Sequence, residues 1–170
     1  MSAPTQSDFI NSFGHSYQAF GLTRLMGNIV GLLLSEDGPQ SLTAITERLG
    51  VSKGPVSQIT RRLADNQLIE RVPVAGSRRD HYEAVPDIFG QAYANHAGKQ
   101  AKNLELARRF QQRLDDEGVH APDYFRRRVD EMVCFYELMT EYHEAFTAEW
   151  QRRRERLAAG LPVEECEDAS

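Results

Sequence analysis

The stretch from Ser41 to Leu63 constrains the fold of this chain more than any other part of the sequence. It opens with a short run whose apolar residues recur at helical spacing: Leu42, Ile45 and Leu49. Ser41 is a favoured residue before a helix, and Gly50 a favoured residue just past one. Ser52 precedes a second such run, in which Pro55 falls in the first turn, where its missing N–H costs little. Two short helices joined by a few residues that include glycine are typical of a helix-turn-helix.

Two runs of alternating apolar and polar residues follow the second helix. Residues 68–74 and 80–85 are predicted strands, and Gly76 gives the turn between them its backbone freedom. A β-hairpin directly after a helix-turn-helix is the wing of a winged helix. The predicted fold class is therefore mainly α with a small β-hairpin (α+β), a winged helix-turn-helix with long N- and C-terminal dimerisation helices.

The rest of the chain is predicted to be helical. Residues 5–19 and 22–35 form two helices before the helix-turn-helix, and residues 86–118 and 121–159 form two long helices after it. The last helix carries apolar residues at alternating steps of three and four, which is the spacing of a heptad seam. An apolar stripe of that length needs another protein surface to cover it, and a second copy of the chain is the simplest candidate. The predicted dimerisation residues are Phe9, Phe125, Val129, Met132, Tyr136, Met139, Phe146 and Trp150.

Four regions follow from these elements. They are an N-terminal dimerisation helix (1–20), a winged helix-turn-helix DNA-binding domain (21–85), a helical dimerisation region (86–160) and a disordered acidic tail (161–170). The start of the chain lacks the basic and apolar pattern of a secretory signal, and no apolar run approaches the ~20 residues that span a bilayer. We therefore expect a cytoplasmic, nucleoid-associated protein without a membrane partner.

The distribution of charge matters more here than its sum. The net charge is −5, which by itself argues against a nucleic-acid partner. The segment from Lys53 to Arg79, however, contains six basic and two acidic residues, so its net charge is +4. Salt screens exposed charges beyond roughly 8–10 Å, so a basic face can meet DNA while the acidic remainder points away.

The second helix of the motif is the predicted recognition helix. Rotation by about 100° per residue turns Gln58 and Arg61 outward, where their forked side chains suit adenine and guanine respectively. Lys53 and Arg62 are expected at phosphates. At the hairpin tip, two adjacent arginines are expected to enter a minor groove or clamp its backbone, and which of them enters is left open. The predicted DNA-binding residues are Ser52, Lys53, Gly54, Pro55, Ser57, Gln58, Arg61, Arg62, Arg78 and Arg79. The alternative interpretation is a solvated charged surface.

The sequence resembles the MarR superfamily of winged-helix regulators, and specifically its GbsR-type branch. The matching segments are Phe20–Gly27, Gly31–Leu34, Ser41–Leu42, Leu49, Ser52–Ser57, Arg61–Leu63 and Gly76–Glu83. This resemblance implies a homodimer with two winged-helix lobes that acts most commonly as a repressor at a pseudo-palindromic operator. It also implies an effector such as a quaternary ammonium osmolyte, held in an aromatic pocket by cation–π contacts. The candidate pocket residues are Phe13, Tyr17, Phe20, Phe89 and Tyr93. Packing in the dimer core is the alternative role of these aromatic residues.

Other chemistry is not indicated by the sequence. The histidines show no metal-ligand spacing, so no metal or other cofactor is expected. His143 interrupts the heptad seam, where it either fixes the register or lies exposed. Cys134 is expected to be a buried, inert thiol. No nucleophile motif or phosphate-binding loop is present, so the chain is not expected to be an enzyme. The alternative function is a winged helix used as a protein-interaction module without specific DNA binding.

Overall fold

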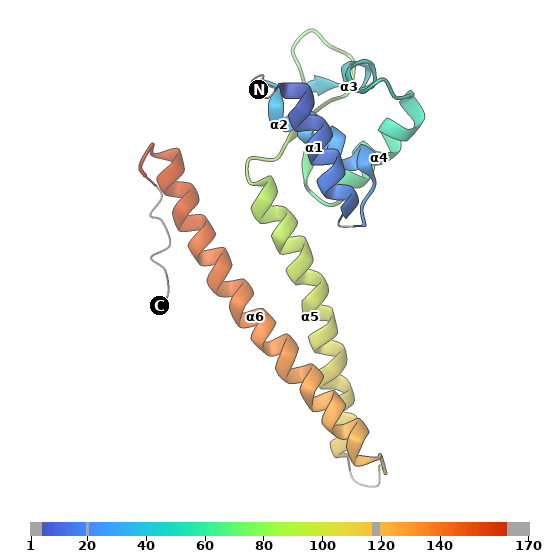
Figure 1. Cartoon of the computed structure of the whole chain (residues 1–170), viewed down its shortest axis with the longest axis vertical. Coiled ribbons are helices and arrows are strands. Elements are labelled where there is room, and N and C mark those ends of the chain that lie inside the picture. The colour runs from blue at the N-terminus through green and yellow to red at the C-terminus, as the bar shows by residue number, and fades with distance from the viewer. Residues whose placement is uncertain (1–4, 20, 117–119, 163–170) are drawn as a thin grey trace. The chain divides into compact units, whose positions relative to one another are not determined.

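The computed structural model describes residues 5–19, 21–116 and 120–162, and its elements are shown in Figure 1. They follow in the order α1 (Gln6–Ala19), α2 (Arg24–Ser35), β1 (Gln40–Ser41), α3 (Leu42–Leu49), α4 (Lys53–Asp65), β2 (Ile69–Val72), β3 (His81–Ala84), α5 (Ile88–Asp115) and α6 (Asp123–Ala158). The chain divides into two compact units, one ending at Ala92 and the other beginning at Tyr93. The predicted class, a mainly helical winged helix with a small sheet, is confirmed.

Helix α2 is the centre of the first unit. Its sequence is apolar on most sides, and it packs against α1, α3, α4 and β3. It begins after Thr23, whose hydroxyl accepts a hydrogen bond from Met26 N at 3.2 Å. The side chains that are almost completely buried in this core are Ile29, Val30, Leu32, Ile45, Val56, Leu63 and Ile69. An all-round apolar helix is stable only when other elements cover it, and here the helix-turn-helix and the wing do so.

The sheet has three strands rather than the two that the sequence predicts. Its order is β1-β3-β2, and both pairings are antiparallel. In the hairpin, Arg71 pairs with Tyr82, and on the other side of β3 Gln40 pairs with Tyr82. Strand β1 has only two residues, so it is too short to show the alternation by which strands are recognised.

The second unit holds most of α5 and all of α6, which run alongside each other (Figure 1). Polar contacts between them include Asn103 Nδ2 donating to Tyr136 Oη at 3.1 Å and the ion pair of Arg108 with Glu137 at 2.9 Å. The apolar contacts bury Ala107, Leu114, Val129 and Val133. Part of the seam that the sequence assigns to dimerisation therefore packs within the chain. None of the helices that the structure describes is both long and apolar enough to cross a membrane.

Candidate nucleic-acid interface

Helix α3, the first helix of the helix-turn-helix, has a well-capped start and end. Ser41 Oγ accepts a hydrogen bond from Ala44 N at 3.1 Å. The helix ends at Gly50, whose φ of 62° lies in the left-handed region that glycine adopts without strain. The chain then turns and α4 begins at Lys53, as the helix-turn-helix pattern predicts.

Helix α4 has one buried face and one exposed face. The buried face consists of Val56, Ile59, Thr60 and Leu63, which is the inward set expected from the sequence. The exposed residues are Lys53, Gly54, Pro55, Gln58, Arg61 and Arg62, and Ser57 is half-buried beside them. Since the inward set is apolar apart from Thr60, burial fixes the rotation of the helix and leaves the polar side chains in solvent.

The N-terminus of α4 is open to a ligand. Ser52 occupies the cap position but makes no side-chain capping hydrogen bond, in contrast to Ser41 on α3. The first N–H groups of a helix lack partners within it and carry the positive end of its dipole. With Lys53 next to it and exposed, this end of α4 can accept a phosphate oxygen.

The wing is the hairpin of β2 and β3 with the turn at 73–80. Gly76 has a φ of 78°, the turn conformation for which glycine is suited. The turn is held by Arg79 N donating to Ser77 Oγ at 3.2 Å and by His81 Nδ1 lying 2.9 Å from the carbonyl oxygen of Arg79. Arg79 is exposed at this turn, and so is Arg78 beside it.

Asp80 forms the one ion pair within the wing that the structure describes. Its carboxylate lies 3.2 Å from Nε of Arg71, where the two strands meet the turn. Its carbonyl oxygen accepts a hydrogen bond from Leu42 N at 3.2 Å, which joins the wing to the start of α3. Asp80 therefore neutralises Arg71, and the two arginines of the turn keep their charge.

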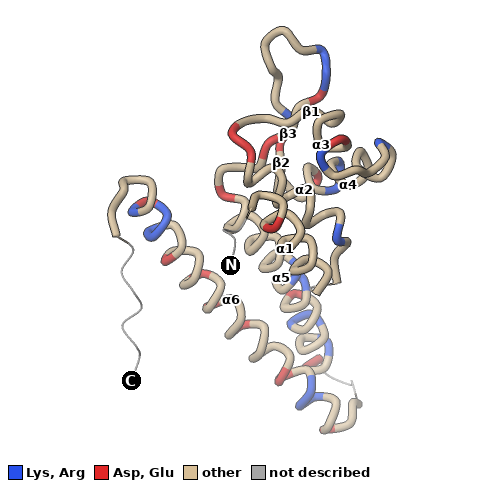
Figure 2. Tube along the Cα trace, turned by 45° about the horizontal axis from the view of Figure 1, so that its top comes forward, with Lys and Arg blue, Asp and Glu red and all other residues tan. Residues whose placement is uncertain are grey.

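Five cations on α4 and the wing have no acidic partner among the residues that the structure describes. They are Lys53, Arg61, Arg62, Arg78 and Arg79. Figure 2 shows basic positions along α4 and on the loop between β2 and β3. On α6, by contrast, Arg128, Arg152 and Arg153 pair with glutamates within about one turn. The unpaired cations belong to the first unit, on the elements that the sequence analysis assigned to DNA.

The residues predicted to form an aromatic pocket lie in different surroundings. On α1, the ring centroids of Phe13 and Tyr17 lie 5.3 Å apart, and both side chains pack against the core around α2. Burial raises the pKa of the Tyr17 hydroxyl. Phe89 is exposed, and Tyr93 contacts His143 and Phe146 in the second unit. Phe20 lies outside the described residues.

The predicted dimerisation residues also differ in exposure. Val129 is buried, Met132, Tyr136, Met139 and Trp150 are half-buried, and Phe9, Phe125 and Phe146 are exposed. Helix α1 packs against α2 within the first unit, so its core residue Ile10 serves the winged-helix unit directly. Most of the predicted acidic tail lies outside the described residues.

One expectation for a single residue on α6 is wrong. Cys134 is exposed, because its position on α6 turns away from α5. Of the two alternatives for His143, exposure is wrong: the residue is 7% accessible, and its ring centroid lies 4.4 Å from that of Tyr93. A role of His143 in fixing the register stays a prediction. The periodicity of one helix does not say which of its faces meets a neighbouring helix.

The fold and the charged surface define a winged helix-turn-helix protein. Comparison with known proteins agrees: the MarR family pattern matches residues 32–81, which span β1, the helix-turn-helix, β2 and the turn of the wing. The HTH-type transcriptional regulator MmpR5 of Mycobacterium tuberculosis is 31% identical over 130 residues, with 76% of each chain covered. The chain belongs to the MarR family of winged-helix transcription regulators.

Further similar proteins are also named as transcription regulators. The putative HTH-type transcriptional regulator YvaV of Bacillus subtilis is 24% identical, and the match covers 85% of this chain and 88% of that protein. The HTH-type transcriptional repressor OpcR of Bacillus subtilis is 23% identical, with 85% of each chain covered. A crystal structure of a transcriptional regulator superposes with a TM-score of 0.73 at 28% identity, covering 88% of this chain and all of that one.

Proposed function

We propose that this protein is a cytoplasmic, sequence-specific regulator of transcription that binds double-stranded DNA as a homodimer. The observation that carries the proposal is the set of unpaired cations on the exposed face of α4 and at the wing turn. Gln58 and Arg61 share that face with the open helix N-terminus, so base-reading forks and phosphate-binding groups occur together on one element.

The dimer proposal rests on a second apolar face of α6. One face packs on α5, as described above. A second stripe is solvent-exposed: Phe135 56%, Leu138 50% and Tyr142 68%, with Phe146 at 50% where the stripe borders the contact with Tyr93 of α5. From Met132 to Ala148 the only residues among Asp, Glu, Lys and Arg are Glu137, Glu141 and Glu144, and helical rotation of about 100° per residue gathers them on the other side of α6. Exposed apolar patches without charges mark interaction surfaces, and a second copy is the partner we propose.

A dimer places two recognition helices in register with DNA. Successive major grooves on one side of the duplex are roughly 34–36 Å apart, so we propose a pseudo-palindromic operator with half-sites one helical turn apart. Repression is the proposed outcome. It is supported by a relative named as a repressor, and by the segments that resemble the GbsR-type branch. From the resemblance to that branch, we propose a quaternary ammonium osmolyte as the effector, and its ability to release the protein from DNA is to be tested.

Fluorescence anisotropy tests the proposal. The full-length protein is titrated into a labelled duplex from upstream of its own coding region and, separately, into a scrambled duplex, at several salt concentrations. We expect tighter binding to the native duplex and a steep loss of affinity with salt, since phosphate contacts release counterions. Absence of binding to either duplex at low salt would favour the alternative function, a winged-helix module that binds protein.

A further inference from the structure

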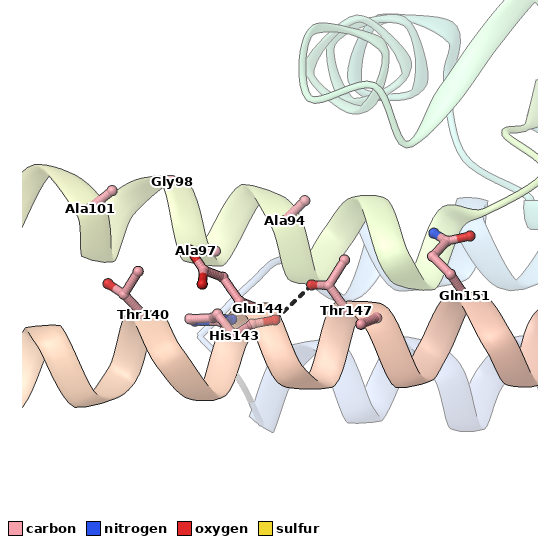
Figure 3. Close-up of a pocket in the computed structure, with 10 residues that line it drawn as sticks. Ala94, Ala97, Gly98, Ala101, Thr140, His143, Glu144, Thr147 and Gln151 are labelled. Carbon is pink, nitrogen blue, oxygen red and sulfur yellow. Dashed lines mark hydrogen bonds between the residues drawn. The ribbon is translucent and has the colours of Figure 1, made fainter.

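Helices α5 and α6 enclose a groove within the second unit. Its cavity volume is about 590 Å³, within the range of sites for drug-sized molecules. Figure 3 shows its lining, which comes from both helices. The lining residues are Ala94, Ala97, Gly98, Ala101, Thr140, His143, Glu144, Thr147, Ala148 and Gln151.

The α5 wall of the groove is made of small residues, and one of them is a glycine in mid-helix. A Cβ added at Gly98 would meet no atom within 4 Å among the described residues. Glycine weakens a helix interior, and close approach of another group is a common reason to find it there. Since none of the described residues approaches Gly98 in this way, the space beside it is available to an occupant from outside the chain.

His143 supplies a hydrogen-bonding group without a partner. The residue is 7% accessible, and both ring nitrogens are buried without a hydrogen bond among the described residues. The two threonines of the α6 wall are already satisfied, because Thr140 Oγ1 donates to the Tyr136 carbonyl oxygen at 2.9 Å and Thr147 Oγ1 to that of His143 at 2.7 Å. A buried imidazole left without a partner costs free energy, and a ligand that hydrogen-bonds to it would recover that cost.

The charge beside the groove selects the kind of ligand. Glu144 is the one residue among Asp, Glu, Lys and Arg that lines it, and it has no ion-pair partner in the part of the chain described. A carboxylate disfavours an anionic ligand and favours a cation. The lining is otherwise mostly apolar, which fits a ligand with an apolar body.

We propose that the α5–α6 groove binds an amphiphilic amine, a protonated primary or secondary amine with an apolar body. Its N–H groups donate to a ring nitrogen of His143 and to the carboxylate of Glu144, and the apolar body lies against the alanines and Gly98. A quaternary ammonium has no N–H group and leaves His143 unpaired, so this site differs in chemistry from the aromatic pocket expected from the sequence.

The groove lies away from most of the proposed dimer surface, which approaches it where Phe146 contacts Tyr93. Rotation of about 100° per residue places Thr140, Glu144 and Gln151 on the side of α6 opposite the stripe of Leu138 and Tyr142. The amine site therefore goes beyond the proposed function and does not depend on DNA binding.

Isothermal titration calorimetry of the full-length protein tests the proposal with 1-naphthylmethylamine as the probe. Its N,N,N-trimethyl derivative and 1-naphthoate serve as ligand controls of similar size. We expect saturable binding of the amine with one site per chain, and affinities roughly tenfold lower or worse for both controls, since each loses a charge-assisted hydrogen bond. Equal affinity for the amine and its trimethyl derivative would overturn the role of His143.

Variants locate the site. Gly98→Leu projects a bulky side chain into the space where an added Cβ meets no described atom within 4 Å, and it should abolish binding. His143→Leu and Glu144→Gln should each weaken binding about tenfold. Glu141→Gln, an exposed glutamate outside the lining, is the matched control and should bind like the native protein. Circular dichroism melts and sedimentation accompany each variant. Unchanged amine binding by Gly98→Leu would overturn the proposal. Conversion of a dimer to a monomer by Gly98→Leu would also overturn it, because that result would show that a second copy of the chain fills the groove.

Discussion

Gly27 of α2 lies directly against Gly14 of α1. A Cβ added at Gly27 would come within 2.8 Å of Gly14 Cα and 2.7 Å of the Phe13 carbonyl oxygen. A Cβ added at Gly31, one turn further along α2, would come within 3.2 Å of Ile10 Cα. The two helices therefore meet backbone to backbone, and this contact attaches α1 to the winged-helix unit.

Gly27→Ala should destabilise the protein. The added methyl group meets backbone atoms, which cannot rotate away, so we expect a loss of about 1–3 kcal/mol, the usual range for overpacking. Urea denaturation followed by circular dichroism measures it. Gly98→Ala is the matched control, because its methyl group meets open space and should raise stability by about 0.5–1 kcal/mol. Equal effects of the two substitutions would contradict the close contact of α1 with α2.

The two serines before α3 and α4 should differ in their effect on stability. Ser41→Ala removes the hydrogen bond to Ala44 N and should cost about 1 kcal/mol. Ser52→Ala removes no side-chain capping bond and should change stability by less than about 0.5 kcal/mol. Its effect should appear in DNA affinity instead, because the hydroxyl is available to a phosphate. Thermal melts and anisotropy on the same preparations separate the two roles.

Arg61→Ala should relax sequence preference. Removal of a bidentate hydrogen bond to guanine costs about 1–3 kcal/mol at one base position, and the variant should bind duplexes altered at that position about as well as the unaltered one. Anisotropy with a set of single-base variants of the operator provides the measurement. A uniform decrease in affinity across all duplexes would instead identify Arg61 as a phosphate-binding residue.

Replacing both wing arginines should reduce the salt dependence of binding. In Arg78→Ala with Arg79→Ala, the slope of log affinity against log salt should fall by about 0.9 for each phosphate that is no longer neutralised. Arg71→Ala with Asp80→Ala is the control within the same hairpin, because it removes an ion pair that has no net charge. If the double variant keeps the native slope, the wing does not bind phosphates.

Tyr142→Glu should convert the dimer to a monomer. A carboxylate in the middle of the exposed apolar stripe of α6 would be buried without a partner in a dimer, and that cost opposes association. Sedimentation velocity over a range of concentrations shows the change. Glu141→Gln, the adjacent exposed residue on the acidic side of α6, should remain dimeric. A dimer that persists in Tyr142→Glu would place the interface elsewhere.

The parts of the fold that could be predicted from sequence are those set by local pattern. The helical spacing of Val56, Ile59 and Leu63 and the glycines at 50 and 76 identify the recognition helix and the wing, since each signal acts within a few residues. Strand β1 was not predicted, because its two residues are held by pairing with β3, far along the chain. The prediction of a buried Cys134 is wrong because this residue lies on the exposed side of α6, while the adjacent Val133 is buried.

The spacing of apolar residues along the chain therefore accounts for the order of the elements, the helix-turn-helix with its wing, and the outward direction of Gln58 and Arg61. These features can be counted along the chain, because helices and strands repeat at fixed intervals. Two further features appear only once the elements are packed together: α6 has one face on α5 and another exposed, and His143 is buried beside the α5–α6 groove. They depend on which surfaces meet, and a period along one helix cannot distinguish a neighbour in the same chain from a second copy or from solvent.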